Sequence, residues 1–456
     1  MGPSDFRDVA GAGGGGTQDR AERNPFSDIV SRPPRQSHSN HRCPISDLDP
    51  DTTEQDDLHG GRSPWFAGLP RPTRHSLTED IRCDALIVGC GITGALMAER
   101  LTRQGLDVVL VDRELPGHGS TAASTSMLLW EIDRSLSELT ELYGFERAVR
   151  AYRASFEAVD GLQTLVRDLE LPCDFRAKSS LYLAASEDAT SLINENALRA
   201  RAGLPGTFLD HRALLGAYEI TRAGAIVSPN SADCDPMQMA IGLLNVAHGR
   251  GARFFETEAV RYDSASRSVG VSTSEGRMIE ARHVILATGY VMPDVVETKV
   301  QSPSSSWAIA TAPQPDRLWR DGVLIWEDSK DYLYARTTRA GRIIIGGEDS
   351  DKIIEPDARD ALIPAKADKL KQRLQALWPR AELNITHRWA GTFDTTRDGL
   401  PLIGPVPKHP NLFAAYGYGG NGITFSYLAA QLLGDLVNGK RSQLLDDFAL
   451  DRDVAA

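Results

Sequence analysis

The stretch that decides the fold is Asp84-Ala-Leu-Ile-Val-Gly-Cys-Gly-Ile-Thr-Gly94, in which a short apolar run leads into a glycine-rich turn. A run of this kind is typical of a buried strand in a parallel sheet. The apolar pattern of residues 95–101 predicts a helix that ends at Gly105, and residues 108–111 predict a second buried strand. Strand, helix and strand at this spacing predict a right-handed βαβ unit and hence a parallel sheet.

The turn between the first strand and the helix is a candidate dinucleotide site. Gly89, Gly91 and Gly94 form the pattern G-x-G-x-x-G, which permits a tight turn and a close approach of the backbone to a pyrophosphate. The helix N-terminus adds free N–H groups and a partial positive charge. Asp112 follows Gly94 by 18 residues, where a carboxylate can accept hydrogen bonds from both ribose hydroxyls. This acid disfavours NADP and leaves NAD and FAD open.

Composition narrows the class of protein. The 456 residues are enough for two or three folded units, and 62 acidic against 50 basic residues disfavour nucleic acid and anionic lipid as partners. Five scattered cysteines without a Cys-x-x-Cys pair indicate a reducing compartment. The apolar stretch 85–98 is too short to span a membrane, and the N-terminus lacks the pattern of a signal peptide. We expect a cytoplasmic protein without a membrane span.

The two ends of the chain are set apart from the expected domains. Residues 1–62 are dominated by Gly, Pro, Ser, Asp and Arg, which predicts a disordered extension, and residues 446–456 form a C-terminal tail. His38, His41 and Cys43 have a spacing that permits metal binding, but they lack a fourth ligand, so we expect no metal site.

The rest of the chain suggests a second domain inserted twice into the first. Asp235 and Pro236 predict a helix start, and a strand over 283–287 turns sharply at Thr288-Gly289. The last helix is expected over 424–438. Strand-like runs fill the two long stretches between these elements. The expected division is a dinucleotide-binding domain of residues 63–130, 235–290 and 395–445, with a substrate domain of residues 131–234 and 291–394.

A second glycine cluster, Gly417-Tyr-Gly-Gly-Asn-Gly422, lies between a predicted strand over 412–416 and the last helix. No strand tipped by an acid follows it, so it is not a second dinucleotide turn. Glycines at a helix N-terminus can present N–H donors to a group on which negative charge develops.

Motifs in the same order resemble those of the flavoprotein family of D-amino-acid oxidase, glycine oxidase and sarcosine oxidase, in particular its amine-oxidising branch that includes gamma-glutamylputrescine oxidase. The similarity covers about residues 64–440. The motifs are residues 84–94, Gly119-Ser-Thr-Ala-Ala-Ser-Thr125, Ala287-Thr-Gly289, and the pair Asp398-Gly-Leu-Pro-Leu-Ile-Gly404 and Gly417-Tyr-Gly-Gly-Asn-Gly-Ile-Thr424.

This resemblance implies an α/β and α+β protein: a Rossmann-like FAD-binding domain with a doubly inserted, mainly antiparallel β-sheet substrate domain. It implies FAD as the cofactor, with the pyrophosphate at the first glycine turn, the adenosine ribose at Asp112, and the loop from Gly419 to Thr424 over the pyrimidine end of the flavin ring. The cofactor-binding residues expected on this basis are Gly89, Gly91, Gly94, Asp112, Arg113, Ser120, Thr121, Val260, Thr288, Gly289, Gly419, Gly420, Asn421, Gly422, Ile423 and Thr424.

The sequence departs from the amino-acid-oxidising relatives where they bind a substrate carboxylate. Relatives often have Gly-x-Arg-Pro before the Asp-Gly motif, whereas this chain has Gly391-Thr-Phe-Asp394. Arg336 sits where another family arginine often lies, so one carboxylate contact is expected from it. The candidate aromatic lining of the substrate site is Tyr334, Trp389, Phe393 and Trp130.

The expected reaction is oxidation of the C–N bond of a primary or secondary amine, or an amino acid, by hydride transfer to the flavin. The amine must be neutral, which an aromatic site achieves by desolvation, and no catalytic His or Asp is required. The electron acceptor is oxygen or a carrier. Two alternatives remain: oxidation of a 2-hydroxy acid or alcohol, which a histidine facing the flavin would favour, and a flavin-binding subunit without turnover. A nicotinamide-dependent dehydrogenase is the least favoured hypothesis, because the C-terminal glycine loop is of the flavoprotein type.

Overall fold

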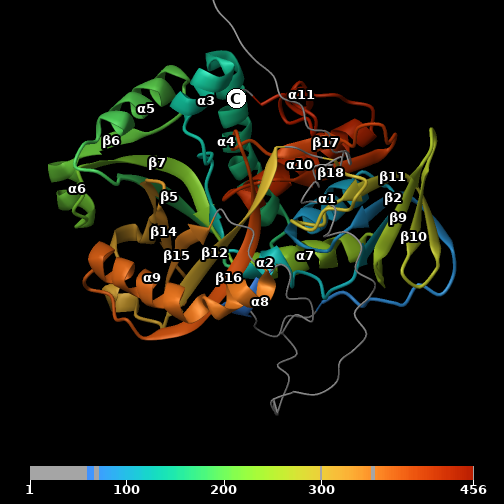
Figure 1. Cartoon of the computed structure of the whole chain (residues 1–456), viewed down its shortest axis with the longest axis horizontal. Coiled ribbons are helices and arrows are strands. Elements are labelled where there is room, and N and C mark those ends of the chain that lie inside the picture. Colours follow the sequence, from blue (N-terminus) through green and yellow to red (C-terminus); the bar gives the residue numbers. More distant parts are fainter. Residues whose placement is uncertain (1–58, 66–70, 298–299, 351–354, 455–456) are drawn as a thin grey trace, which may run out of the picture. The chain divides into compact units, whose positions relative to one another are not determined.

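The computed structural model describes residues 59–65, 71–297, 300–350 and 355–454, whose strands form two sheets (Figure 1). The structure confirms the predicted mixture of α/β and α+β architecture. The candidate metal ligands His38, His41 and Cys43 lie outside the described residues.

The first sheet has eight strands and a parallel centre in the order β18-β11-β2-β3-β8. Strand β17 extends it antiparallel at one edge, and the β9–β10 hairpin joins it through β11. Both faces of β2 are buried, which explains the uninterrupted apolar run in its sequence. The strands are β2 (Ile81–Val88), β3 (Val108–Asp112), β8 (Arg253–Glu256), β9 (Ala259–Ser264), β10 (Val269–Thr273), β11 (Met278–Leu286), β17 (Leu402–Pro405) and β18 (Leu412–Tyr416).

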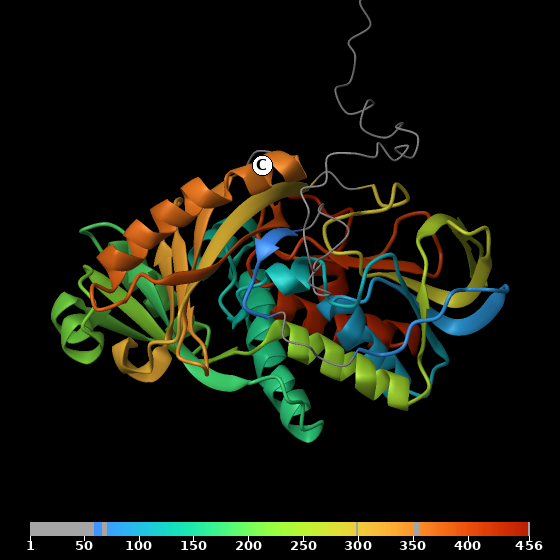
Figure 2. The same cartoon turned by 90° about the horizontal axis from the view of Figure 1, so that it is seen from below.

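Helices pack against one face of this sheet. Helix α1 (Ile92–Arg103) contacts both α7 (Pro236–Gly249) and α10 (Gly422–Val437), and α10 also contacts the long helix α4 (Phe145–Asp168). The predicted start of α7 is confirmed, since the Asp235 carboxylate accepts hydrogen bonds from the second and third residues after it. Figures 1 and 2 both show α4 between the two sheets. Its apolar side belongs to the same core as α1, α7 and α10.

The second sheet has ten strands and is antiparallel except for the pair β5–β13. Its main path runs β1-β16-β12-β15-β14-β13-β5-β7-β4, with β6 paired to β7. Helix α9 (Ile363–Leu377) covers one face near β12 and β15 (Figure 1). The strands are β1 (His59–Arg62), β4 (Met127–Leu128), β5 (Arg176–Ala184), β6 (Thr207–Asp210), β7 (Gly224–Asp233), β12 (Gln301–Thr311), β13 (Leu324–Asp328), β14 (Leu333–Thr337), β15 (Ile343–Ser350) and β16 (Ile385–Thr396).

Strand β1 corrects the expected N-terminal boundary. Residues His59–Arg62 were expected in a disordered extension, but they pair antiparallel with residues 388–391 of β16. The side chain of His59 is buried, and the backbone hydrogen bonds of the ladder supply the stabilisation that composition does not reveal. The folded part of the chain therefore begins earlier than expected.

The remaining helices have at most 12 residues, and α3 has a capping box at Ser135 and Glu138. They are α2 (Ser120–Ala123), α3 (Leu136–Tyr143), α5 (Thr190–Arg201), α6 (His211–Tyr218), α8 (Pro356–Ala361) and α11 (Leu444–Asp447), with 3-10 turns η1 (Pro315–Arg317) and η2 (Arg320–Gly322). Among the described helices, none has both the length and the apolar character needed to cross a bilayer.

Candidate active site

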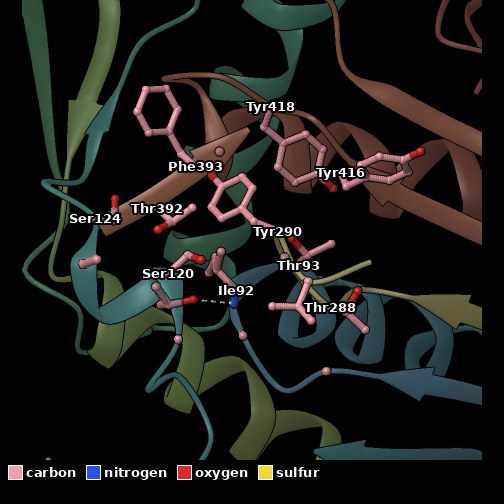
Figure 3. Close-up of a pocket in the computed structure, with 18 of the residues that line it drawn as sticks. Ile92, Thr93, Ser120, Ser124, Thr288, Tyr290, Thr392, Phe393, Tyr416 and Tyr418 are labelled. Atoms are coloured by element: carbon pink, nitrogen blue, oxygen red, sulfur yellow. Dashed lines mark hydrogen bonds between the residues drawn. The ribbon is translucent and has the colours of Figure 1, made fainter. Parts of the chain in front are cut away.

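A cavity of about 770 Å³ extends from the ends of the parallel strands to the ten-stranded sheet. Its lining includes the β2–α1 turn, the end of β3, the segment from α2 to Asp133, residues 287–295, and strands of both sheets. In the view of Figure 3 the ring of Tyr290 lies between Phe393 and Ile92, and all three residues line the cavity. The predicted dinucleotide turn and the aromatic residues thus share one cavity.

The turn at the start of α1 depends on glycine. Gly89 has φ +110°, and a Cβ there would overlap the carbonyl oxygen of Ala287. A Cβ at Gly94 would overlap the carbonyl oxygen of Gly89, so this glycine acts in packing and does not itself line the cavity. The N-cap residue Gly91 has no side chain and so caps none of the N–H groups of the first turn.

Asp112 lies at the end of β3 on the cavity wall. Its carboxylate accepts the Cys90 N–H at 2.6 Å and the Glu114 N–H at 2.9 Å. Burial raises the pKa of Asp112, and the two backbone N–H groups act in the opposite direction. Each carboxylate oxygen keeps further acceptor capacity, which matches the need for an acceptor of two vicinal hydroxyls.

The segment around α2 adds polar atoms to the same part of the cavity. The Thr121 hydroxyl accepts the Ile92 N–H at 2.9 Å, drawn as a dashed line in Figure 3, and so fixes the start of α1. The Ser120 hydroxyl is buried and has no hydrogen-bond partner among the described residues. Thr288 and Gly289 also line this part, and a Cβ at Gly289 would lie 3.5 Å from the Ser120 hydroxyl. Arg113 and the half-exposed Val260 line the end near Asp112.

The loop before α10 is tied to the segment after β4. The Gly420 N–H donates to Asp133 at 2.8 Å, and the Asn421 side-chain amide donates to the Glu131 carbonyl at 2.6 Å. The Thr424 hydroxyl donates to the Leu129 carbonyl at 2.9 Å, so Thr424 positions the loop without lining the cavity. Other lining residues of this loop are Gly419, Gly422 and Ile423.

The remaining part of the cavity is aromatic. The Tyr334 hydroxyl lies 3.0 Å from the Ser306 hydroxyl, and the Trp389 indole N–H donates to the Ala123 carbonyl at 2.8 Å. Tyr334 lies across Gly346, where any Cβ would overlap its ring. The aromatic residues that line this part are Tyr290, Trp326, Tyr332, Tyr334, Trp389, Phe393 and Tyr418.

Two of the expected substrate-binding residues do not line this cavity. Arg336 is buried, and its Nη1 donates to the carbonyls of Thr125, Ser126 and Cys234 at 3.0, 2.6 and 2.9 Å. Its Nε donates to the Thr337 carbonyl at 3.1 Å and lies 3.6 Å from Asp233, so both Nη1 and Nε are engaged within the protein. Trp130 is also fully buried and donates to the Pro229 carbonyl. Arg336 therefore does not make the substrate-carboxylate contact that the sequence predicts, and Trp130 does not form part of the predicted aromatic lining.

Sequence reasoning missed several lining residues. Tyr332 is two residues before Tyr334, and the two-residue period of a strand could have placed both on one face. Tyr290 directly follows the Thr288-Gly289 turn, which also marks it as a candidate. Asp133 has no comparable signal, because its place under the glycine loop depends on contacts between segments nearly 290 residues apart.

The comparisons with known proteins agree with this geometry. Residues 84–436 match the model of the family described as FAD dependent oxidoreductase, so the chain belongs to that family and uses FAD as its cofactor. The residues present fit this group: a glycine turn without side chains, an acidic acceptor at Asp112, an unpartnered hydroxyl at Ser120 and a second glycine loop.

Among known proteins, the chain is similar to the gamma-glutamylputrescine oxidoreductase of Escherichia coli strain K12, with 26% identity over 384 residues, 82% of this chain and 88% of the relative. The solved glycine oxidase of Geobacillus kaustophilus has the same fold, with a TM-score of 0.69, 22% identity, and coverage of 82% of this chain and 100% of that one. The iminodiacetate oxidase of Chelativorans sp. BNC1 gives a TM-score of 0.63 at 19% identity, covering 80% and 98% of the two chains.

Proposed function

We propose that this FAD-dependent oxidoreductase oxidises the C–N bond of a primary or secondary amine. The observation that carries the proposal is the aromatic part of the cavity, which is continuous with the part that fits the dinucleotide. The similarity to an oxidoreductase of gamma-glutamylputrescine supports the same reaction class.

The residues of the chain have one main task in this reaction, which is to bind the amine in its neutral form. An alkylammonium has a pKa of about 10.4 in water. Desolvation among Tyr290, Tyr334, Trp389 and Phe393 disfavours the charged form and leaves the nitrogen lone pair available. As the lone pair forms a C=N bond, the neighbouring carbon loses a hydride equivalent, and water then hydrolyses the iminium to a carbonyl compound and the free amine or ammonia. FAD, when bound, supplies the two-electron acceptor for that hydride.

We also infer a division of labour between the two sheets. Residues 63–130, 235–290 and 395–445 would bind FAD, since they supply the glycine turn, Asp112 and the late glycine loop. Residues 131–234 and 291–394 would form the substrate side, because they supply most of the aromatic lining. Gly89, Gly91, Ser120 and Thr121 would lie along the pyrophosphate, and the loop from Gly419 to Ile423 would face the flavin ring.

Oxidation of a 2-hydroxy acid has less support. That reaction requires a base for the hydroxyl proton, and within the described lining of the cavity there is no histidine. The described lining also offers no arginine or lysine on its aromatic side to pair with a substrate carboxylate. Its two arginines, Arg113 and Arg261, lie at the Asp112 end.

The test is anaerobic mixing of the FAD-loaded protein with panels of alkylamines, amino acids and 2-hydroxy acids, followed by the visible absorbance of oxidised flavin. We expect bleaching by at least one amine and none by the hydroxy acids. Bleaching by hydroxy acids alone would replace the proposal with the alcohol-oxidising alternative. Bound flavin that no compound reduces would favour the non-catalytic subunit. Admission of air to the reduced protein, with measurement of peroxide, then separates oxygen from a carrier as acceptor.

A further inference from the structure

The charge on the aromatic side of the cavity is negative. Asp133 is an exposed residue that lines this cavity. Within the part of the chain that the structure describes, no ion pair is formed by Asp133. A substrate carboxylate would therefore meet a like charge here, whereas a substrate cation would find a partner.

The surroundings of Asp133 are built to keep this carboxylate in place. One oxygen accepts the Gly420 N–H at 2.8 Å. A Cβ at Gly419 would overlap the carboxylate, and a Cβ at Gly420 would lie 3.0 Å from its second oxygen. The glycine loop thus leaves room for Asp133 and holds one of its oxygens, which leaves the other for a ligand.

Aromatic rings line the same cavity as this carboxylate, among them Tyr290, Tyr332 and Tyr334. The Tyr332 hydroxyl donates to Asp349 at 2.6 Å, which fixes its ring at the cavity wall. The rings of Tyr332 and Tyr334 lie with their centroids 5.9 Å apart. A tyrosine face attracts a cation that lies within about 6 Å of the ring centroid, so these rings and the carboxylate favour the same kind of ligand.

We propose that Asp133 selects the substrate, and that the substrate class is an aliphatic diamine whose second nitrogen stays protonated beside Asp133. The inference rests on the amine-oxidising function proposed above. The reacting nitrogen is neutral among the aromatic rings, and the distant ammonium is held by Asp133 and the tyrosine faces. Asp133 is a specificity-determining residue in this scheme and takes no proton from the reacting carbon.

The test compares three probes of equal chain length on the FAD-loaded enzyme: 1,4-diaminobutane, 1-aminobutane and 4-aminobutanoate. Anaerobic flavin bleaching gives a dissociation constant and a limiting rate for each probe. The variant Asp133→Asn removes the charge but keeps an oxygen acceptor for the Gly420 N–H. The matched control Glu187→Gln removes the same charge at an exposed position outside the cavity.

We expect the wild type to bind the diamine most tightly and the amino acid least. In Asp133→Asn the diamine dissociation constant should rise about 10- to 100-fold, with little change in the limiting rate or in 1-aminobutane binding. Glu187→Gln should behave as the wild type. A purely structural role of Asp133 would instead change all three probes together, or change none of them.

Binding without turnover provides a second readout. The bis-quaternary analogue of 1,4-diaminobutane, hexamethylated on its nitrogens, has no lone pair to react and carries two permanent charges. Calorimetry should show tighter binding of this compound than of butyltrimethylammonium to the wild type, and loss of the difference in Asp133→Asn. If the variant fails to retain FAD, the ranking of probes by the wild type decides.

The two proposals fail in different ways. If 1-aminobutane or 4-aminobutanoate reduces the flavin as well as the diamine does, the selection by Asp133 is overturned while amine oxidation stands. If no amine reduces the bound flavin, amine oxidation itself is overturned.

Discussion

Replacement of Asp112 tests the assignment of the ribose site most directly. Of about four lone-pair positions on the carboxylate, two are used by the N–H groups of Cys90 and Glu114. Two positions remain for the vicinal hydroxyls of the adenosine ribose. Asparagine has one acceptor oxygen, so Asp112→Asn must give up about half of these bonds, whereas Asp112→Ala gives up all of them.

The magnitudes follow from this count. A hydrogen bond to a charged acceptor contributes about 1.5 to 3 kcal/mol. Loss of one ribose bond in Asp112→Asn should raise the FAD dissociation constant about 10- to 150-fold, and loss of both in Asp112→Ala about 10²- to 10⁴-fold. Burial raises the pKa of Asp112, so the charged form is costly in the FAD-free protein, and removal of the charge offsets part of the lost hydrogen bonding. We therefore expect a smaller effect on folding than on FAD affinity in Asp112→Asn.

The assay is titration of FAD into the deflavinated protein, followed by quenching of flavin fluorescence, with far-UV circular dichroism to verify folding. Glu256→Gln is the matched control, because Glu256 is aligned with Asp112 on the neighbouring strand but does not line the cavity. The control should bind FAD as the wild type does. Wild-type affinity in folded Asp112→Ala would refute the ribose assignment.

Three further changes test other parts of the structure. Arg336→Met leaves buried backbone carbonyls without their donor, whereas Asp233 keeps its two hydrogen bonds from Arg176, so we expect a loss of about 1 to 3 kcal/mol in the free energy of unfolding by urea. The order of amine substrates should be unchanged, and an altered order would return this arginine to the substrate site. Gly94→Ala places a methyl group against the preceding turn, so it should lower both the melting temperature and the affinity for FAD. Gly216→Ala is the matched control, because a Cβ in this helix has open space around it, and it should stabilise the folded protein by about 0.5 to 1 kcal/mol. Burial raises the pKa of Asp133 to about 6, and the nearby charge of Asp349 adds to this effect. The preference for the diamine over 1-aminobutane should therefore be lost as the pH falls through about 6, because the carboxylate is then protonated. A preference that does not change between pH 5 and pH 8 would contradict this.

Local signals in the sequence predict the first sheet well. The run before Gly89 is apolar because both faces of β2 are covered, and Asp235 followed by Pro236 marks the start of α7. Helices α3 and α4 were not expected, and α4 packs on α10 although it belongs to a stretch assigned to the second domain. Strand β1 was missed because its stability comes from pairing with β16, more than 300 residues away.

Sequence-based prediction is weaker for the site than for the first sheet, above all for the charge of the site. Arg336 follows a family position, and sequence alone gives no means to see that four backbone carbonyls accept from its Nη1 and Nε and that Asp233 lies beside it. Asp133 carries no motif, yet the glycines at 419 and 420, which the sequence does single out, are needed in part to make room for it. A motif therefore identifies the loop, while the side chain facing that loop decides the charge of the ligand. Because Arg336 is internal and Asp133 faces the cavity, the electrostatic preference of the site is reversed from carboxylate to cation, which is the difference that the diamine and amino-acid probes measure.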